Sequence, residues 1–165
     1  MRETLSYMEV KNKLNSIISP RDRALCCILY GSAGRINEVL KLRKSDIRME
    51  NNYLLISLRT EKNPNHPERI VPIPLKEEWV VKPIADYLEV CDGRLFNFSD
   101  RLARNITRKC MDCNPHFLRH TRLTHLVSIY RADEHRLRMI AGWVDTRPAY
   151  IYVHLNWKDT KDIFE

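Results

Sequence analysis

The stretch YLLISLRTEKNPNHPERIVPI, residues 53–73, interrupts an otherwise helical sequence pattern and decides the fold class. Tyr53–Leu58 and Arg69–Ile73 are short apolar runs of the kind that form strands. The segment Arg59–Glu68 between them is polar and contains two prolines, which favours a hairpin loop. We therefore predict one small antiparallel sheet built around this hairpin.

Helical segments flank the hairpin on both sides. Helix-start signals, serine or proline in the first turn, recur along the chain. The predicted helices are Met1–Ile18, Pro20–Tyr30, Arg35–Leu42, Lys76–Val90, Ser99–Met111, Pro115–Tyr130, Asp133–Ala141 and Arg147–His154. The order of helices, sheet and helices predicts a mainly α fold with a small antiparallel β-sheet, an α+β class. We expect Ile163 and Phe164 to form a small apolar anchor at the end.

The composition fits a single domain spanning residues 1–165. Hydrophobic residues make up 44% of the chain and charged residues 30%, a balance that excludes wholesale disorder. Apolar runs such as Ala24–Tyr30 are far shorter than a membrane span, and Met1–Val10 lacks the pattern of a signal peptide. We expect a soluble intracellular protein, cytoplasmic or nucleoid-associated, with no membrane partner.

The charge balance favours a polyanionic partner, nucleic acid first. Lys and Arg number 28 against 21 Asp and Glu, which gives a formal net charge of +7. Arginine is concentrated toward the C-terminus, with nine arginines and only four acidic residues between Arg101 and Arg147. Because the guanidinium group matches phosphate geometry, this region is the candidate phosphate-binding part of the chain.

Three segments carry side chains that suit phosphate chemistry. In the first, Arg35 lies at a helix start directly after a glycine, where backbone N–H groups favour an anion. Glu38 follows one turn later and can hold a guanidinium or an imidazole in place. Taken alone, this pair also fits a surface helix with an i,i+3 ion pair.

The second and third segments add an imidazole, a further guanidinium and two phenols. His116 and Arg119 are three residues apart and share one face of a helix in its first turn. Taken alone, this pair equally fits a solvated basic helix. Near the C-terminus, Trp143 precedes Tyr150 and Tyr152, which are both possible nucleophiles. Aromatic residues in such a tail are also common in cores and interfaces.

In this order, the three segments resemble the catalytic domain of tyrosine recombinases, the phage, viral and archaeal integrase family, over roughly Pro20 to His154. The first arginine box of the family matches Gly31 to Asp46, and its His-x-x-Arg box matches His116-Phe-Leu-Arg119. Its Gly-His or Gly-Trp pair matches Gly142-Trp143, although Ala141 stands where leucine is usual. The family tyrosine comes nine residues later and often precedes x-His, which selects Tyr152 over Tyr150.

The resemblance implies a set of catalytic residues and their support. The implied catalytic residues are Arg35, Lys62, His116, Arg119, Trp143 and Tyr152, with Glu38 and His120 as supporting residues. The family places its lysine in the β-hairpin loop, where Lys62 lies. It also carries a separate N-terminal DNA-clamping domain, which we expect to be absent from residues 1–165.

The implied reaction is phosphoryl transfer on double-stranded DNA. Tyr152 attacks a backbone phosphorus, a 3′-phosphotyrosyl bond forms and a 5′-hydroxyl leaves, with no nucleotide or metal cofactor. Arg35 and Arg119 donate to the phosphate oxygens and lower the pKa of Tyr152. His116 acts as the general base and Lys62 as the general acid. The resemblance implies a site-specific recombinase or integrase that assembles as a dimer or tetramer on DNA, in the host cell of a virus or mobile element.

Further basic residues are candidate contacts to the DNA backbone. These residues are expected to bind phosphates with little sequence preference and strong salt dependence. They are Arg101, Arg104, Arg108, Lys109 and Arg122. A solvated basic face explains the first four equally well.

Three alternatives stay open. A type IB topoisomerase uses a similar active site for a different outcome, and a non-catalytic DNA-binding regulator would keep the fold without the chemistry. A zinc site would use Cys110, Cys113, His116 and His120, but these four lie closer together in sequence than the ligands of ordinary structural zinc sites. We therefore expect no metal.

Overall fold

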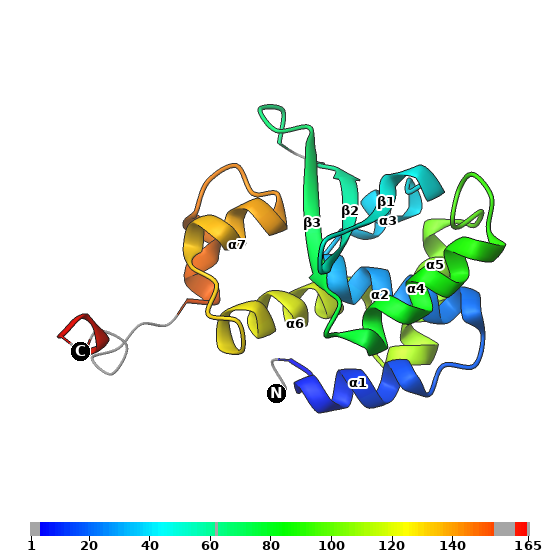
Figure 1. Ribbon diagram of the computed structural model, residues 1–165, viewed down its shortest axis with the longest axis horizontal. Helices are drawn as coiled ribbons and strands as arrows, with labels where there is room; N and C mark the ends of the chain where they lie inside the picture. Colours follow the sequence, from blue (N-terminus) through cyan, green and yellow to red (C-terminus); the bar gives the residue numbers. More distant parts are fainter. Residues whose placement is uncertain (1–3, 62, 154–160, 165) are drawn as a thin grey trace.

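The computed structural model describes residues 4–61, 63–153 and 161–164 (Figure 1). The α-helices in these ranges are α1 (Tyr7–Asn15), α2 (Pro20–Ser32), α3 (Ile36–Leu40), α4 (Glu78–Val90), α5 (Asp100–Met111), α6 (Pro115–Ser128) and α7 (Glu134–Ala141). The strands are β1 (Ile47–Glu50), β2 (Tyr53–Arg59) and β3 (Glu68–Pro74). Three short 3-10 helices are η1 (Lys44–Asp46), η2 (Arg147–Ile151) and η3 (Lys161–Phe164). This architecture confirms the predicted mainly α fold with a small antiparallel sheet.

The sheet has the strand order β1-β2-β3, and both neighbouring pairs are antiparallel. The predicted hairpin is the β2–β3 pair, in which Arg59 lies opposite Glu68. Strand β1 was not predicted, because a four-residue strand with a single buried residue has too little alternation to be recognised. Asn51, with a φ of 55°, turns the chain from β1 into β2.

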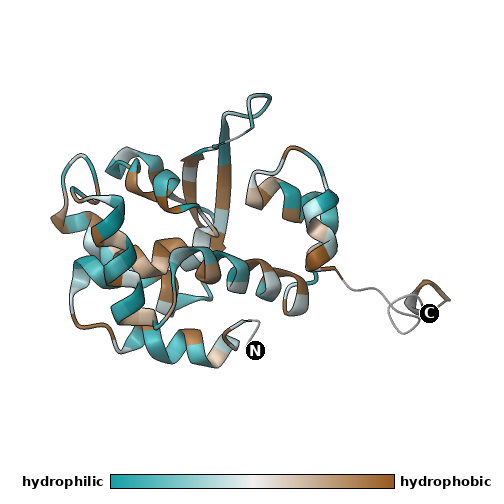
Figure 2. Cartoon of the chain, turned by 180° about the vertical axis from the view of Figure 1, so that it is seen from behind, coloured by the Kyte–Doolittle hydropathy of each residue, from teal (hydrophilic) through white to brown (hydrophobic). Residues whose placement is uncertain are grey.

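Helix α2 lies at the centre of the main hydrophobic core. Residues 24–32 are all buried, and Figure 2 shows hydrophobic residues gathering on this part of the fold while the tip of the β2–β3 hairpin is hydrophilic. A Cβ atom placed on Gly31 would lie 2.6 Å from Ile73 Cδ1, so the glycine allows α2 to approach the sheet closely. The helix predicted over Pro20–Tyr30 continues to Ser32, and its C-cap residue Ala33 has a φ of 52°.

A second, smaller hydrophobic cluster joins α7 and η2 to helix α6. Leu123 and Leu126 of α6 pack with Leu137 of α7 and Ala149 of η2. Figure 1 shows α7 and η2 on one side of the β2–β3 hairpin, with α2, α4 and α5 on the other. Helix α6 belongs to both parts, because Leu118 lies in the main core. Side chains from the two parts can therefore meet above α6.

The two ends of the chain differ from expectation. Helix α1 begins at Tyr7, where Ser6 and Glu9 form a capping box. The helix predicted over Arg147–His154 is the 3-10 helix η2, and His154 lies outside the described residues. Ile163 and Phe164 are 78% and 89% exposed rather than forming an anchor. Within the part of the chain that the structure describes, no helix is both long and apolar enough to cross a membrane.

Candidate active site

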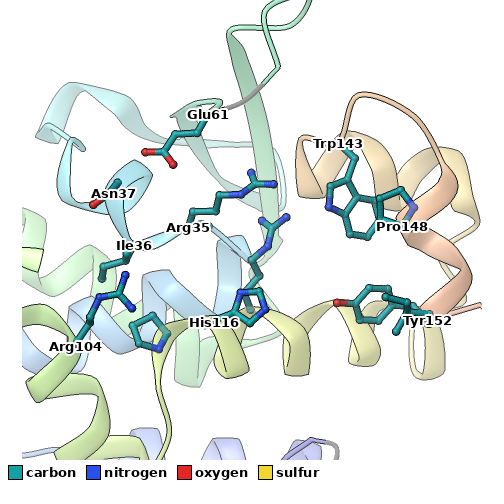
Figure 3. Close-up of a pocket in the computed structure, with 13 residues that line it drawn as sticks. Arg35, Ile36, Asn37, Glu61, Arg104, His116, Trp143, Pro148 and Tyr152 are labelled. Carbon is teal, nitrogen blue, oxygen red and sulfur yellow. The ribbon is translucent and has the colours of Figure 1, made fainter.

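One pocket of about 420 Å³ brings together five of the predicted catalytic side chains from all three predicted segments (Figure 3). Its lining includes Arg35, His116, Arg119, Trp143 and Tyr152. Lys62, the sixth predicted residue, lies outside the described residues, although the preceding Glu61 lines the pocket. The site therefore forms only when the two parts of the fold that α6 joins are packed together, because no single segment contains all of these residues.

The first segment presents Arg35 at the start of α3. Ala33 reverses the chain, and Arg35 adopts an extended conformation as the N-cap residue. The carboxylate of Glu38 accepts the backbone N–H of Arg35 at 2.8 Å, which completes the helix start. The Arg35 side chain is 24% exposed and reaches the carbonyl oxygen of Ala141 at 3.4 Å.

Arg119 lies deeper than Arg35 and shares one of its partners. Its guanidinium donates to the carbonyl oxygens of Ala33 and Ala141, the latter at 3.0 Å. Burial, together with the positive charges of Arg35 and Arg69, lowers the pKa of Arg119 to about 10. Arg119 therefore keeps its charge at neutral pH, and the cations around it favour the binding of an anion.

Sequence reasoning missed Arg69, which is the main partner of Glu38. Glu38 was expected to orient Arg35 or His116, and it does contact Arg35, at 3.5 Å. Its two carboxylate oxygens, however, accept from the Arg69 guanidinium at 2.7 and 2.8 Å. Burial raises the pKa of Glu38, but the hydrogen bonds and charge of Arg69 outweigh burial, so this pKa lies below its ordinary value.

A signal for Arg69 was present in the sequence. It alternates with Val71 and Ile73 along β3, and all three side chains point to the buried face of the strand. An arginine in register with a buried apolar face requires a buried acidic partner. The pattern therefore indicates an ion pair, although it does not say with which carboxylate.

The candidate nucleophile Tyr152 lies between two aromatic side chains. Its hydroxyl oxygen is 2.8 Å from His120 Nδ1, and its ring stacks on Trp143 at a centroid distance of 5.9 Å. Figure 3 shows the hydroxyl directed across the pocket toward the side where His116 lies. Tyr150 is 73% exposed and does not line this pocket. The geometry thus places Tyr152, rather than Tyr150, at the site.

One expectation about Tyr152 is wrong in this structure, and a second acquires an alternative. Its pKa was expected to fall beside two guanidinium groups, but burial raises it above the ordinary value and the charge of Arg119 only partly opposes this. The general base was assigned to His116, which is exposed at the start of α6. The imidazole that contacts the phenol is instead that of His120, one helical turn further on.

The candidate DNA-contacting residues divide into two groups. Arg101, Arg104, Arg108 and Lys109 are exposed on α5 as predicted, and Arg104 also lines the pocket, where it pairs with Asp100. Arg122 does not fit the prediction. It is 1% exposed and binds both carboxylate oxygens of Glu77, at 2.8 and 2.9 Å. Its guanidinium is therefore used inside the core and is not available to a phosphate.

The zinc alternative finds no support in the fold. Cys110, Cys113, His116 and His120 were its proposed ligands. Across residues 4–61, 63–153 and 161–164, no three histidine, cysteine, aspartate or glutamate side chains gather closely enough to hold a metal ion. Cys110 and Cys113 instead pack against the main hydrophobic core.

Comparison with known proteins places the chain in a recognised group. Residues 3–159 match the phage integrase family. The chain is 26% identical to the tyrosine recombinase XerC of Actinobacillus succinogenes over 173 residues, covering 93% of this chain and 56% of that protein. It is 31% identical to the tyrosine recombinase XerA of Thermococcus onnurineus over 145 residues, covering 76% of this chain and 49% of that protein.

Solved structures show the same fold. The XerH site-specific recombinase bound to its difH substrate, in a pre-cleavage complex, matches with a TM-score of 0.79 at 17% identity, covering 99% of this chain and 54% of that one. The crystal structure of XerA recombinase matches with a TM-score of 0.76 at 24% identity, covering 99% of this chain and 62% of that one. The chain spans about half the length of the curated relatives it matches.

Proposed function

Because this chain belongs to the phage integrase family, we propose that it cleaves and rejoins strands of double-stranded DNA through a covalent bond between Tyr152 and a backbone phosphate. The observation that carries the proposal is the meeting of the Tyr152 phenol with Arg35 and Arg119 in one pocket. The two guanidinium groups supply the positive charge that a phosphate requires, and the phenol supplies a nucleophile beside it.

The first step breaks one phosphodiester bond and forms another. Tyr152 Oη attacks the phosphorus, a 3′-phosphotyrosyl bond forms, and the bond to the 5′-oxygen breaks. His120 Nδ1, 2.8 Å from the phenol oxygen, takes the phenol proton. Lys62 gives a proton to the 5′-oxygen as it leaves. In the reverse sense a 5′-hydroxyl attacks the phosphotyrosine, so the strand is rejoined without a nucleotide.

The cations of the pocket stabilise the transition state. Negative charge grows on the non-bridging oxygens of the phosphate, and Arg35 and Arg119 donate hydrogen bonds to them. Hydrogen bonds to the carbonyl oxygen of Ala141 already hold both guanidinium groups in place. His116 and Trp143 line the same pocket and add single donors. Loss of one such donor commonly lowers the rate by about 10²–10³.

The exposed face of α5 extends the binding surface beyond the pocket. Arg104 lines the pocket, and Arg101, Arg108 and Lys109 continue the positive charge along the helix. We propose that these side chains contact the DNA backbone on one side of the cleaved phosphate. Contacts of this kind set register and affinity without reading sequence.

The biological role that we propose is site-specific recombination by a dimer or tetramer assembled on DNA. A strand exchange needs a cleaved strand in each of two duplexes, and each chain supplies one Tyr152. The similarity to the tyrosine recombinases XerC and XerA supports recombination as the outcome. Integration of a mobile or viral genome is the alternative outcome of the same chemistry.

Covalent capture on a nicked duplex tests the proposal. The nick lets the short 5′-hydroxyl fragment diffuse away, so the phosphotyrosyl adduct accumulates; a library of such duplexes with randomised sequence removes the need to know the site. We expect wild-type protein to form an adduct that survives SDS, Tyr152→Phe to bind the same DNA without an adduct, and Tyr150→Phe to form the adduct normally. Mass spectrometry of the DNA-linked peptide identifies the nucleophile.

Other outcomes separate the alternatives. Binding without any adduct in the wild type would indicate a non-catalytic DNA-binding regulator. An adduct at scattered sequences, together with relaxation of supercoiled plasmid, would indicate a topoisomerase-like enzyme. If Tyr150→Phe loses the adduct and Tyr152→Phe keeps it, Tyr150 is the nucleophile and the assignment to Tyr152 is wrong.

A further inference from the structure

Two buried arginine–glutamate ion pairs with the same geometry occur in the described part of the chain. Arg69 binds the two carboxylate oxygens of Glu38 at 2.7 and 2.8 Å. Arg122 binds those of Glu77 at 2.9 and 2.8 Å. The side chains are 6% and 0% exposed in the first pair and 1% and 1% in the second. The two pairs are therefore close chemical equivalents placed in different surroundings.

The carboxylate of the first pair is attached to two catalytic segments. Besides Arg69, Glu38 accepts the backbone N–H of Arg35 at 2.8 Å, which fixes the start of α3. It also accepts the backbone N–H of Glu61 at 3.0 Å. Glu61 is the residue directly before Lys62, so one carboxylate joins the segment of the first arginine to the hairpin segment of the lysine.

The guanidinium of the same pair is attached to a third catalytic segment. Arg69 Nε donates to the carbonyl oxygen of Ile140 at 2.8 Å, close to the end of α7. A Cβ atom on Gly142 would lie 2.7 Å from Arg69 Nη1, which shows how closely the backbone before Trp143 packs on the guanidinium. Arg69 Nη1 also donates to Thr60 Oγ1 at 3.2 Å, in the hairpin.

Within the described residues, the second pair makes no hydrogen bond to the segments of Arg35, Glu61 or Trp143. Glu77 accepts from the Tyr7 hydroxyl at 2.7 Å, and Arg122 lies over the Tyr30 ring at 4.8 Å. Neither Arg122 nor Glu77 lines the catalytic pocket. The Arg122–Glu77 pair therefore joins α6 to the start of α4 outside the pocket, and it is a control of matched chemistry for the first pair.

We propose that Arg69 is a positioning residue that holds the segments carrying Arg35, Glu61 and Trp143 in register, an inference that rests on the proposed function. The planar fork of an arginine donates in several fixed directions at once, and Arg69 uses it on Glu38, Ile140 and Thr60 together. A lysine keeps the charge but not the fork. A misplacement of a catalytic group by about 1 Å can lower the rate about 10²-fold. Loss of the guanidinium fork should therefore slow catalysis even in protein that remains folded.

Matched lysine variants of the two pairs test the proposal. Arg69→Lys and Arg122→Lys each keep a buried charge and lose a bidentate contact, so both lower the melting temperature. The measurement is single-turnover adduct formation on the nicked duplex, made at a temperature at which circular dichroism shows both variants to be folded. We expect Arg69→Lys to form the adduct about 10²-fold more slowly than wild type, with unchanged affinity for DNA, and Arg122→Lys to match the wild type.

A second readout needs neither DNA nor catalysis. With 5-fluorotryptophan incorporated, ¹⁹F NMR resolves Trp79, Trp143 and Trp157, which single Trp→Phe substitutions assign. Arg69→Lys is expected to shift or broaden the Trp143 resonance and leave Trp79 unchanged. Arg122→Lys is expected to do the reverse, because Trp79 packs on Tyr7 and Tyr30 beside that pair.

The two readouts distinguish a failure of this inference from a failure of the proposed function. If Arg69→Lys forms the adduct as fast as Arg122→Lys, or if its Trp143 resonance does not change, Arg69 is a structural residue only and the inference is wrong. If the wild-type protein forms no adduct at all, the proposed function fails, and the Trp143 resonance alone then decides whether Arg69 positions this segment.

Discussion

The phenol oxygen of Tyr152 lies 2.8 Å from Nδ1 of His120, which directly follows Arg119 on α6. One helix therefore carries both a buried guanidinium that lines the pocket and the imidazole that contacts the candidate nucleophile. His116, one turn earlier, is exposed at the mouth of the same pocket. The two histidines thus have different positions relative to the Tyr152 phenol, and experiments can separate their proposed roles.

Replacing His120 by glutamine should remove the base and keep a hydrogen-bonding side chain. We expect His120→Gln to lower the single-turnover cleavage rate by about 10²–10⁴. A general base acts only when it is unprotonated, so the wild-type rate should rise with pH on the acidic side, and His120→Gln should abolish that rise. His116→Gln should lower the rate but keep that rise, because His116 serves as a donor. Rate profiles between pH 5 and 9 measure the effect, and loss of the rise in His116→Gln alone would make His116 the base.

The ionisation of Tyr152 should respond to the charge of Arg119. Burial raises the pKa of Tyr152, and the positive charge of Arg119 opposes this rise. Arg119→Met removes the opposing charge, so the pKa of Tyr152 should rise further. Carbon-13 NMR of tyrosine labelled at Cζ follows the titration, and Tyr152→Phe assigns the signal. Arg108→Met, outside the pocket, is the control; a fall of the pKa in Arg119→Met would contradict the structure.

The arginines of α5 and the buried Arg122 should differ in the salt dependence of DNA binding. Each phosphate contact contributes about 0.9 to the slope of log K against log salt concentration. Arg108→Ala should therefore reduce the slope by roughly that amount if it contacts one phosphate. Arg122→Lys should leave the slope unchanged, because its guanidinium lies in the core. Fluorescence anisotropy over a range of salt concentrations measures both, and equal slopes in all three proteins would remove Arg108 from the DNA surface.

Two glycines with similar backbones should tolerate alanine differently. Gly142 and Gly93 have φ values of +73° and +67°, so alanine costs about 1–2 kcal/mol of backbone strain at each. A Cβ atom on Gly142 would also lie 2.7 Å from Arg69 Nη1, whereas a Cβ atom on Gly93 would lie 3.4 Å from Arg43 Nη2, an ordinary van der Waals contact. Urea unfolding should show a greater loss of stability for Gly142→Ala, and only that variant should lose cleavage activity. Equal effects would mean that the Arg69 contact adapts freely.

Helix caps, prolines and short apolar runs account for most of the helices and strands that were predicted correctly. Ser99 caps α5 by accepting the N–H of Leu102 at 3.1 Å, and Pro115 begins α6 directly after its cap residue Asn114. The hairpin follows from two apolar runs around a proline-containing loop. Strand β1 escaped prediction because its pairing with β2, rather than any pattern of its own, makes it a strand.

The sequence predicted which residues form the candidate site more accurately than it predicted which residues contact one another. Arg35 and Tyr152 were chosen from motif order, and both line the pocket. Arg122 was expected at the surface because arginine usually is. Its partner Glu77 lies 45 residues away in the chain, and no local pattern shows that such a pair will form.

The sequence by itself determined the order of the helices and of the β2–β3 hairpin, the fold class and the polar side chains available for chemistry, because caps, turns and hydrophobic periodicity act over a few residues. Only the tertiary structure decided which arginines bind Glu38 and Glu77 and which face solvent. It also decided that burial raises the pKa of Tyr152 and that His120 contacts the phenol. Desolvation and charge pairing depend on distances across the folded chain, and those distances exist only once α6, the hairpin and η2 have packed together.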